Sequence, residues 1–305
     1  MLFKKFLFFL LSLWCIVTGT FVLMHAIPGD PFIGERPLPD EVLKALHAHW
    51  GLDAPLLVQY GRYWLALVQG DLGRSIVYEG QTVVSLIGEA FPISARLGLQ
   101  ALVLAIVMGT FGGIVAALFR KSWVDRVTLA WTTLGVSIPN FVVASILQYW
   151  LAVRWHYLPV ARWGGWEHTV LPTLALAILP TAFILRLIRA SLSDALSQDY
   201  IRTALAKGLS VRAVVWKHGV LNALLPVVTY LGHVGAQILT GSFMIEKIFA
   251  IPGLGQWMIV SIGGRDYPMI AGLALFYGTL LVTIMFLIEL ITWTIDPRIK
   301  RSDAP

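Results

Sequence analysis

Six stretches of about 20 predominantly apolar residues follow one another along the 305-residue chain, and they limit its possible folds more than any other feature. An α-helix needs about 20 apolar residues to cross the hydrocarbon core of a bilayer, so each stretch predicts one spanning helix. The predicted spans are Phe6–Ile27, Leu97–Phe119, Leu129–Val153, Val170–Ile188, Leu224–Met244 and Ile270–Ile291. The sequence therefore predicts an all-α integral membrane protein with six transmembrane helices.

The overall composition agrees with a membrane protein and excludes most other classes. Hydrophobic residues make up 57% of the chain and charged residues only 13%, with a mean hydropathy of +0.76. Ordinary globular domains carry about 25% charged residues, and a soluble protein of this composition would expose large apolar patches to water. Disordered, collagen-like, coiled-coil and disulfide-scaffold proteins are excluded as well. The single cysteine, Cys15, is expected to be a small buried apolar side chain.

The first apolar stretch is expected to be a retained anchor helix, residues 1–27, rather than a cleaved secretion signal. Lys4 and Lys5 precede it, as basic residues precede the apolar core of a signal. However, the stretch is too long for such a core, and no small-x-small cleavage site follows it.

Basic residues are distributed unevenly between the two sides of the predicted membrane. The termini and the loops on their side hold 14 of the 23 lysines and arginines against five acidic residues, whereas the opposite loops hold nine against eleven. Because cytoplasmic loops carry the excess of Lys and Arg, both termini are expected in the cytoplasm.

The segment between the first two spans, residues 28–94, is expected to form a small extracytoplasmic cap. Apolar residues at helical spacing, with Gly51, Gly70 and Pro92 as boundaries, predict three short amphipathic helices. These helices are expected after Pro39, over Leu56–Gln69 and over Val83–Phe91. Covering a pore mouth, receiving a partner and a purely structural role all stay open for this segment.

The loop between the fourth and fifth spans, residues 189–223, predicts two short helices around a tight turn. Asp199 is a favourable N-cap for the first helix, and Gly208 is a favourable residue to end it. Ser210 is a favourable N-cap for the second helix, which Gly219 would close. The two expected helices are Tyr200–Lys207 and Val211–His218.

Three interpretations of this loop compete. Its length and basic residues superficially fit a nucleic-acid helix-turn-helix, but a segment tethered at both ends beneath a bilayer could hardly reach a major groove. A basic element resting on anionic lipid is a second interpretation. We favour the third, a docking surface for a cytosolic protein, in which apolar residues enter a cleft and basic residues fix the orientation. No nucleic-acid partner is therefore expected.

The residues of the loop also occur in a recognisable order: Asp199–Ser210, then Lys217-His218, then Asn222–Pro226. This order resembles the cytoplasmic loop of ABC importer permeases, in particular those of the peptide and nickel group. The general signature of that family begins Glu-Ala-Ala and places glycine after three further residues. Here Arg202-Thr203-Ala204 precedes Gly208, a form similar to the peptide-group variant.

Other segments resemble the same group, in the same order and on the predicted sides of the membrane. They are Pro28–Pro31, Phe32–Pro39, Gly51–Pro55 with Gln59-Tyr60, Gly70–Ser75, Glu246–Gly255, Arg265–Pro268 and Ile295–Ile299. The second of these is similar to the oligopeptide-type B subunit in particular. Lys247 departs from the small polar residue that is usual at its position.

The resemblance implies a permease subunit of an ATP-driven, binding-protein-dependent importer in the bacterial cytoplasmic (inner) membrane. A five-helix permease domain would cover residues 95–295, with a cytoplasmic tail at 296–305. The implied partners are a second, C-type permease, two cytosolic ATPase subunits and an extracytoplasmic peptide-binding protein. Oligopeptides are the expected cargo; dipeptides, glutathione and nickel are alternatives. The residues implied in coupling to the ATPase are Tyr200, Arg202, Thr203, Ala204, Lys207 and Gly208.

No motif in the sequence predicts an enzyme or a bound cofactor. The chain contains no Gly-x4-Gly-Lys-Ser/Thr phosphate loop, no His-Glu-x-x-His and no Gly-x-Ser-x-Gly. His47 and His49 would point to different faces of their helix, so no metal site is expected there. A stand-alone channel or secondary transporter stays an alternative, although no clear internal repeat supports it.

Polar residues within the predicted spans are candidates for the translocation path. They are Asn140, Gln148, His233, Gln237 and Glu289, and Pro139 and Pro180 are able to bend their helices. Interhelical hydrogen bonds or side chains that reach the interface would explain each of these residues equally simply. The glycines of the second and fifth spans, among them Gly109, Gly113 and Gly232, are expected to allow close helix packing.

Overall fold

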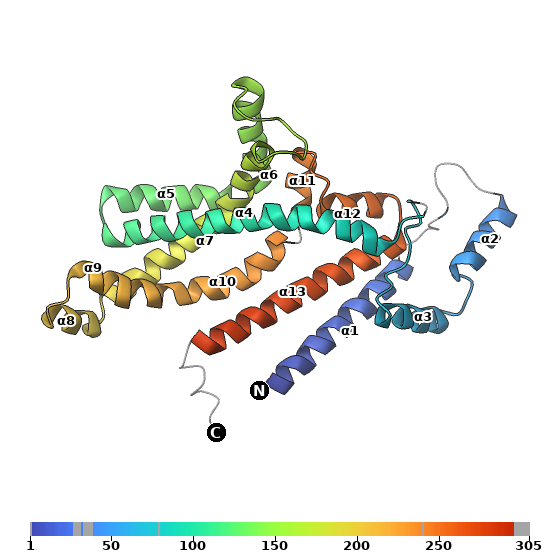
Figure 1. Ribbon diagram of the computed structural model, residues 1–305, viewed down its shortest axis with the longest axis horizontal. Coiled ribbons are helices and arrows are strands. Elements are labelled where there is room, and N and C mark those ends of the chain that lie inside the picture. Colours follow the sequence, from blue (N-terminus) through green and yellow to red (C-terminus); the bar gives the residue numbers. More distant parts are fainter. Residues whose placement is uncertain (1, 27–31, 33–38, 79, 240, 296–305) are drawn as a thin grey trace. The chain divides into compact units, whose positions relative to one another are not determined.

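The computed structural model describes residues 2–26, 32, 39–78, 80–239 and 241–295, and helices dominate this part of the chain (Figure 1). The helices of the first half of the chain, up to Arg154, are α1 Leu2–Ala26, α2 Asp40–Trp50, α3 Leu56–Val68, α4 Val83–Leu118, α5 Trp123–Ser137, α6 Asn140–Leu147 and the π-helical segment η1 Gln148–Arg154. The remaining ones are α7 Glu167–Leu196, α8 Asp199–Ala206, α9 Val211–Val214, the π-helical segment η2 Val215–Val220, α10 Leu221–Leu239, α11 Phe243–Ile248, α12 Leu254–Gly263 and α13 Tyr267–Ile295. No β-strand occurs within the described ranges, which confirms the predicted all-α class.

Five helices are long and apolar enough to cross a membrane, and a bent pair of helices makes a sixth span if it is counted as one. The five correspond to α1, α4, α7, α13 and the continuous run α9–η2–α10. The bent pair is α5 followed by α6–η1. The six predicted spans therefore correspond to five long apolar helices and one bent pair of helices.

The third predicted span, Leu129–Val153, is wrong as a single straight helix. α5 and α6–η1 meet at an angle of 102° around Ile138 and Pro139. Ile138 has an extended backbone, with φ −91° and ψ 122°, because the proline ring disfavours the helical conformation of the residue before it. Pro139 also has no N–H to continue the hydrogen-bond ladder.

The chain folds into two compact units. Unit 1 comprises residues 1–92 and 253–282, and unit 2 comprises 93–252 and 283–305. Both α4 and α13 pass from one unit to the other.

Unit 1 contains the helices predicted for the extracytoplasmic cap. α2 and α3 confirm the first two, and Gly51 and Gly70 have the expected left-handed φ of 67° and 76°. The third expected helix is not separate, because α4 continues through Pro92 and through the predicted boundary at residue 94. Its first turns are fixed by a buried apolar cluster, and this packing compensates for the hydrogen bond that the proline lacks. The cluster consists of Val83, Leu86, Ile87, Ala90, Leu254, Met269 and Leu273.

The expectation that the side chain of Cys15 is buried is wrong. The cysteine is exposed rather than buried. Many large apolar side chains of α1 are exposed in the same way, among them Phe8, Trp14 and Leu23. A helix that is apolar on all sides needs an apolar surrounding, and a bilayer supplies it.

Unit 2 is built on the close packing of α4 against α7. A Cβ on Gly109 would lie 2.8 Å from the side chain of Ile184, and one on Gly113 would lie 2.6 Å from that of Ile188. Only glycine permits this approach, which confirms the close-packing role expected for these positions. The fifth span is shorter at its C-terminal end than predicted: α10 ends at Leu239, and Met244 belongs to α11.

The segments that resemble family motifs near residues 28–38 and 296–299 lie outside the described residues, except for Phe32. The predicted tail, 296–305, lies outside them as well.

Candidate functional site

The candidate docking surface is formed by α8, the turn after it and α9, and we call residues 199–214 the α8–α9 hairpin. α8 follows α7 after only two residues. Gln198 is the N-cap, with an extended backbone, so the prediction that Asp199 caps the helix is wrong by one residue. Asp199 instead lies in the first turn, where an acidic side chain interacts favourably with the helix dipole.

The turn of the hairpin forms as the sequence predicts. Gly208 has a φ of +84°, a left-handed conformation that side chains with a Cβ rarely adopt. The hydroxyl of Ser210 accepts a hydrogen bond from the backbone N–H of Ala213 at 3.3 Å and caps the next helix. Four residues therefore connect α8 to α9.

The sequence predicts that the helix after the turn ends at Gly219, and this prediction is wrong. α9 continues through η2 into α10, so one helical run extends from Val211 to Leu239. Gly219 is buried, and a Cβ there would lie 2.7 Å from the side chain of Leu192 on α7. This glycine thus permits contact between two long helices and does not terminate one.

The hairpin has a small apolar core of its own. Ile201, Ala204 and Val214 are buried against one another, with Leu196 at the end of α7 packed beside them. Ala204, one of the residues implied in ATPase coupling, is only 8% exposed. Its side chain therefore holds α8 in place and does not belong to the outer surface.

The other residues implied in coupling lie on the outer surface of the hairpin. Tyr200, Arg202, Thr203, Lys207 and Gly208 are all exposed. The amide of Asn222 donates hydrogen bonds to the Tyr200 hydroxyl, at 3.4 Å, and to the backbone oxygen of His218, at 2.8 Å. The exposed apolar residues on the same surface are Leu205, Leu209 and Val211. Apolar and basic groups thus share a surface whose backbone is held by the local core and the left-handed turn.

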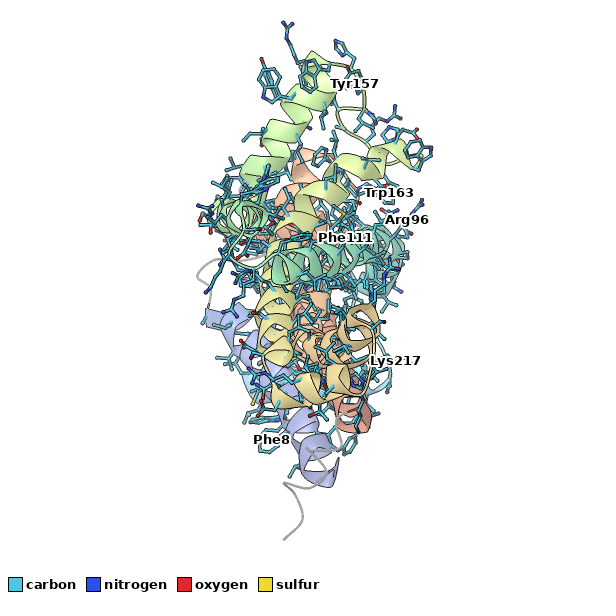
Figure 2. The ribbon with its side chains drawn as sticks, turned by 90° about the vertical axis from the view of Figure 1, so that its left-hand side faces the viewer. Phe8, Arg96, Phe111, Tyr157, Trp163 and Lys217 are labelled. Atoms are coloured by element: carbon cyan, nitrogen blue, oxygen red, sulfur yellow. The ribbon has the colours of Figure 1, made fainter. Side chains whose placement is uncertain are left out.

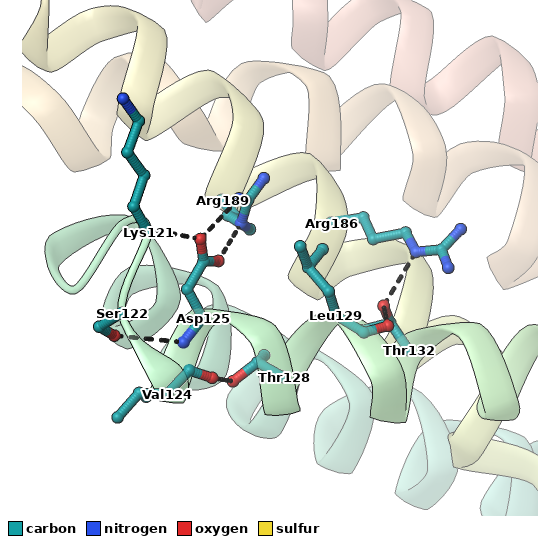
Figure 3. Close-up of polar contacts among 9 residues, drawn as sticks. All are labelled: Lys121, Ser122, Val124, Asp125, Thr128, Leu129, Thr132, Arg186 and Arg189. Carbon is teal, nitrogen blue, oxygen red and sulfur yellow. Dashed lines mark hydrogen bonds and ion pairs between the residues drawn. The ribbon is translucent and has the colours of Figure 1, made fainter.

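A partly buried ion pair joins α5 to α7, on the stretch of α7 that leads to the hairpin (Figure 3). The guanidinium of Arg189 donates to both carboxylate oxygens of Asp125, from Nε at 2.5 Å and from the terminal nitrogen at 2.9 Å. The backbone N–H of Lys121 donates to the same carboxylate at 2.9 Å. The Asp125 side chain is only 4% exposed. Because little water reaches it, these donors stabilise the negative charge of its carboxylate.

A second arginine reinforces the same contact between α5 and α7. Arg186 donates from Nε to the hydroxyl of Thr132 at 2.9 Å and from a terminal nitrogen to that of Thr133 at 2.9 Å. In the sequence, both arginines serve only to predict which side of the membrane is cytoplasmic. Their spacing of three residues at the end of an apolar span was the available signal, since such a spacing places two side chains on one helix face.

The structure does not bring the candidate pathway residues together into one described cluster. Asn140 begins α6, and Gln237 lies exposed on α10. Gln148 donates hydrogen bonds to the backbone oxygens of Val160 and Ile248, at 2.8 and 3.0 Å, so it anchors a loop. The side chains of His233 and Glu289 lie outside the described part of the structure.

Two further family-like segments do meet in unit 1. The hydroxyl of Ser75 donates to the Asp266 carboxylate, which also accepts from the backbone N–H of Ile76 at 3.2 Å. Asp266 and Ser75 are 1% and 3% exposed. Segments about 190 residues apart are therefore joined by a buried polar contact.

Comparison with known proteins identifies the fold and the family. Residues 109–301 match the model of a family described as the binding-protein-dependent transport system inner membrane component. The chain belongs to this family. Over 297 residues it is 46% identical to the dipeptide transport system permease protein DppB of Bacillus subtilis (strain 168), in an alignment that covers 97% of this chain and 96% of that protein.

Other relatives agree. The oligopeptide transport system permease protein OppB of Escherichia coli (strain K12) is 37% identical over 291 residues, 95% of each chain. A crystal structure of an amino acid ABC transporter with histidines has the same fold, with a TM-score of 0.53, 19% identity and coverage of 69% of this chain and 94% of that one. The protein is therefore a multi-pass ABC transporter permease of the bacterial inner membrane and not an enzyme.

Proposed function

We propose that this chain is one of two permease subunits of an ATP-driven peptide importer and that its α8–α9 hairpin takes up the movement of a separate ATPase subunit. The single observation that carries this proposal is the hairpin itself. It presents exposed apolar and basic groups on a backbone held by a local core and a left-handed turn. A surface of this kind suits a protein cleft, because the apolar residues supply contact area and the charges supply orientation.

The connections of the hairpin support a mechanical role. It joins α7 directly to the continuous run of α9–η2–α10, and α7 and α10 pack along each other. The Asp125–Arg189 pair links the end of α7 to α5 as well. Displacement of α8 would therefore move three long helices together, as a shift of packed rigid elements.

The proposed cycle combines this arrangement with what the resemblance to ABC importer permeases implies. Closure of an ATPase dimer would push the hairpins of two permease subunits, and the joined helices would change the pathway from inward- to outward-facing. The net positive side of the chain, which carries the hairpin, would face the cytoplasm. A second, C-type permease and an extracytoplasmic peptide-binding protein would complete the importer.

The cargo we propose is peptides, with oligopeptides as the first candidate because of the segment Phe32–Pro39. Dipeptides are the second candidate, and the 46% identity to a dipeptide permease favours them. Uptake of a labelled dipeptide and of a labelled pentapeptide by cells with and without the gene separates the two. Loss of pentapeptide uptake alone would support the first candidate, and loss of dipeptide uptake alone the second.

The docking proposal is tested by purifying the tagged chain in mild detergent and identifying the subunits that accompany it. We expect an ATPase and a second six-span permease. The charge reversals Arg202→Glu and Lys207→Glu together are expected to release the ATPase and keep the second permease. Retention of the ATPase by this variant, or ATP-independent transport by the chain alone in vesicles, would contradict the proposal.

A further inference from the structure

The segment between α5 and α7 ends in a group of exposed aromatic side chains that the transport cycle above does not use. We call residues 149–166 the aromatic tip. Its exposed aromatic residues are Tyr149, Trp150, Trp155, Tyr157 and Trp166, with exposed fractions from 47% to 75%. Figure 2 shows Tyr157 near the end of this projecting segment. So large an exposed aromatic surface indicates a binding partner.

The tip is a built structure and not a loose loop. The backbone N–H of Tyr157 donates to the oxygen of Leu151 at 2.9 Å, and that of Arg162 donates to the oxygen of Phe249 at 2.8 Å. The side-chain amide of Gln148 donates a hydrogen bond to the backbone oxygen of Val160 at 2.8 Å. Neighbouring rings lie tilted against each other, with centroids 5.6 Å apart for Trp150 and Trp155. The fold therefore holds the rings outward at fixed positions.

Arginines are the charged residues within the tip, and the carboxylate of Glu167 follows directly, close to Gly165. No acidic residue occurs between Asp125 and Glu167. Arg154 and Arg162, by contrast, are both exposed on the tip. Tryptophan and tyrosine concentrate where the membrane meets water, and arginine there binds anionic headgroups. The chemistry of the surface thus matches lipid headgroups.

The geometry of α5 and α6–η1 agrees with a position of the tip near the lipid headgroups. α5 begins beside Arg189 near the hairpin, and its 15 residues cover about 22 Å, most of the roughly 30 Å of a hydrocarbon core. α6–η1 then turns by 102° and runs almost perpendicular to α5. With α5 along the membrane normal, α6–η1 would run along the membrane plane, close to the outer boundary of the hydrocarbon.

The inner corner of this bend is apolar. A cavity of about 450 Å³ lies between α4, α5, α6 and α7. Its lining includes Trp131, Leu134, Ile138 and Ile146. Acyl chains are the natural content of such a corner in a membrane-embedded chain, so hydrocarbon would lie on this side of α6 and headgroups around the rings.

We propose that α6–η1 and the aromatic tip form an interfacial anchor, which lies along the membrane surface opposite the α8–α9 hairpin and binds anionic lipid headgroups through its rings and Arg154. The anchor would hold the outer end of α5 at a fixed depth while the hairpin end moves. A docked binding protein is the competing occupant, and the tryptophan and tyrosine rings together with the two exposed arginines favour lipid.

The single cysteine makes a direct test possible. In the full chain with Cys15→Ser, a spin label at Tyr157→Cys is compared with one at Lys207→Cys, in nanodiscs of phosphatidylethanolamine and phosphatidylglycerol. Oxygen concentrates in the bilayer, whereas a water-soluble nickel chelate stays outside. We expect the ratio of oxygen to nickel collisions to be several-fold higher at 157 than at 207.

Other results of this experiment overturn the proposal. Equal ratios at the two positions would place the tip in water, and protection from both reagents would place it inside another protein. Immobilisation of a water-exposed label on addition of the extracytoplasmic binding protein would assign the surface to protein docking.

The anionic-lipid part of the proposal has its own control. Arg154→Gln is expected to abolish the difference in ratio at position 157 between nanodiscs with phosphatidylglycerol and nanodiscs with only phosphatidylcholine. Arg120→Gln, an exposed arginine between α4 and α5, is expected to leave that difference unchanged. An equal effect of both variants, or no dependence on phosphatidylglycerol in the unmutated tip, would contradict recognition of headgroups by Arg154.

Discussion

The α8–α9 hairpin and the aromatic tip lie at opposite ends of α7, whose 30 residues separate them. Both are connections between long helices, and both expose apolar groups together with basic ones. The exposed apolar residues of the hairpin, however, are mostly aliphatic and lie over a local core and a tight left-handed turn, whereas those of the tip are mostly tryptophan and tyrosine. The mostly aliphatic surface suits a protein cleft, and the mostly aromatic surface suits a lipid interface.

The two regions also differ in how they are held. The hairpin depends on residues close in the sequence, such as Ile201, Ala204 and Val214. The tip depends on contacts with distant segments, such as Arg162 with Phe249. A moving element needs to stay intact while its base shifts, and local interactions serve that purpose. A fixed anchor benefits from being tied to the rest of the unit.

The largest effect is expected from removing the ion pair between Asp125 and Arg189. Asp125→Ala removes a carboxylate that accepts from Arg189 and leaves a partly buried guanidinium unpaired. We expect a loss of about 3 kcal/mol of stability, seen as a lower midpoint of thermal unfolding in detergent. Arg126→Ala, at the exposed neighbouring position, is the control and is expected to change little. If the double variant Asp125→Ala with Arg189→Met is no more stable than Asp125→Ala, the unpaired charge is not the cause.

The second effect separates backbone strain from contact in the hairpin. No atom lies within 4 Å of a Cβ built on Gly208, so a side chain there meets only the strain of φ +84°. For the β-branched Gly208→Val this strain is about 1–2 kcal/mol, and we expect peptide-stimulated ATPase activity of the assembled importer to fall about tenfold. Insertion of the chain into the membrane is expected to be normal.

Gly208→Asn is the matched control, because asparagine tolerates the left-handed conformation. It is expected to keep most of the activity. Equal losses in the two variants would mean that the partner contacts this position directly and that the turn conformation is not what matters.

The contrast between the two regions also explains how much of them the sequence predicts. The turn at Gly208 and the cap at Ser210 follow from signals within four residues and agree with the structure. The inward position of Ala204 depends on contact with Val214 across the turn, and helical spacing alone does not specify that contact.

Long-range features are less predictable. Pro139 indicates a possible bend, but the angle of 102° depends on which distant segments receive α6. The pair Asp125–Arg189 joins residues 64 apart, and a single sequence contains no signal for that pairing. Pro92 predicts a helix end, yet the packing of Leu86 and Ala90 carries α4 through it. In each case tertiary packing overrides the local signal or adds what that signal does not contain.

The third effect tests the tethering of the tip. Gln148→Leu removes two hydrogen bonds, to the backbone oxygens of Val160 and Ile248. We expect a cost of about 1–2 kcal/mol, with faster hydrogen–deuterium exchange at residues 155–165 and unchanged exchange in the α8–α9 hairpin. Ser145→Ala is the control, since its hydroxyl donates only to Phe141 of the same helix. Faster exchange in both regions would show that they are not independently held.

The smallest effect tests whether the order of the hairpin is local. Ser210→Ala removes the oxygen that accepts from the N–H of Ala213, and loss of an N-cap costs about 1 kcal/mol. Because α9 continues into a helical run that ends only at Leu239, this cost is expected to appear as fraying of the first turn, with faster exchange at Ala213 and no change at the aromatic tip. Ser210→Asp keeps an acceptor at the cap and is expected to restore slow exchange. Equal exchange at Ala213 in the two variants would show that the turn is held by the partner surface or by the local core, and the distinction between a locally ordered hairpin and a distantly tethered tip would then no longer hold.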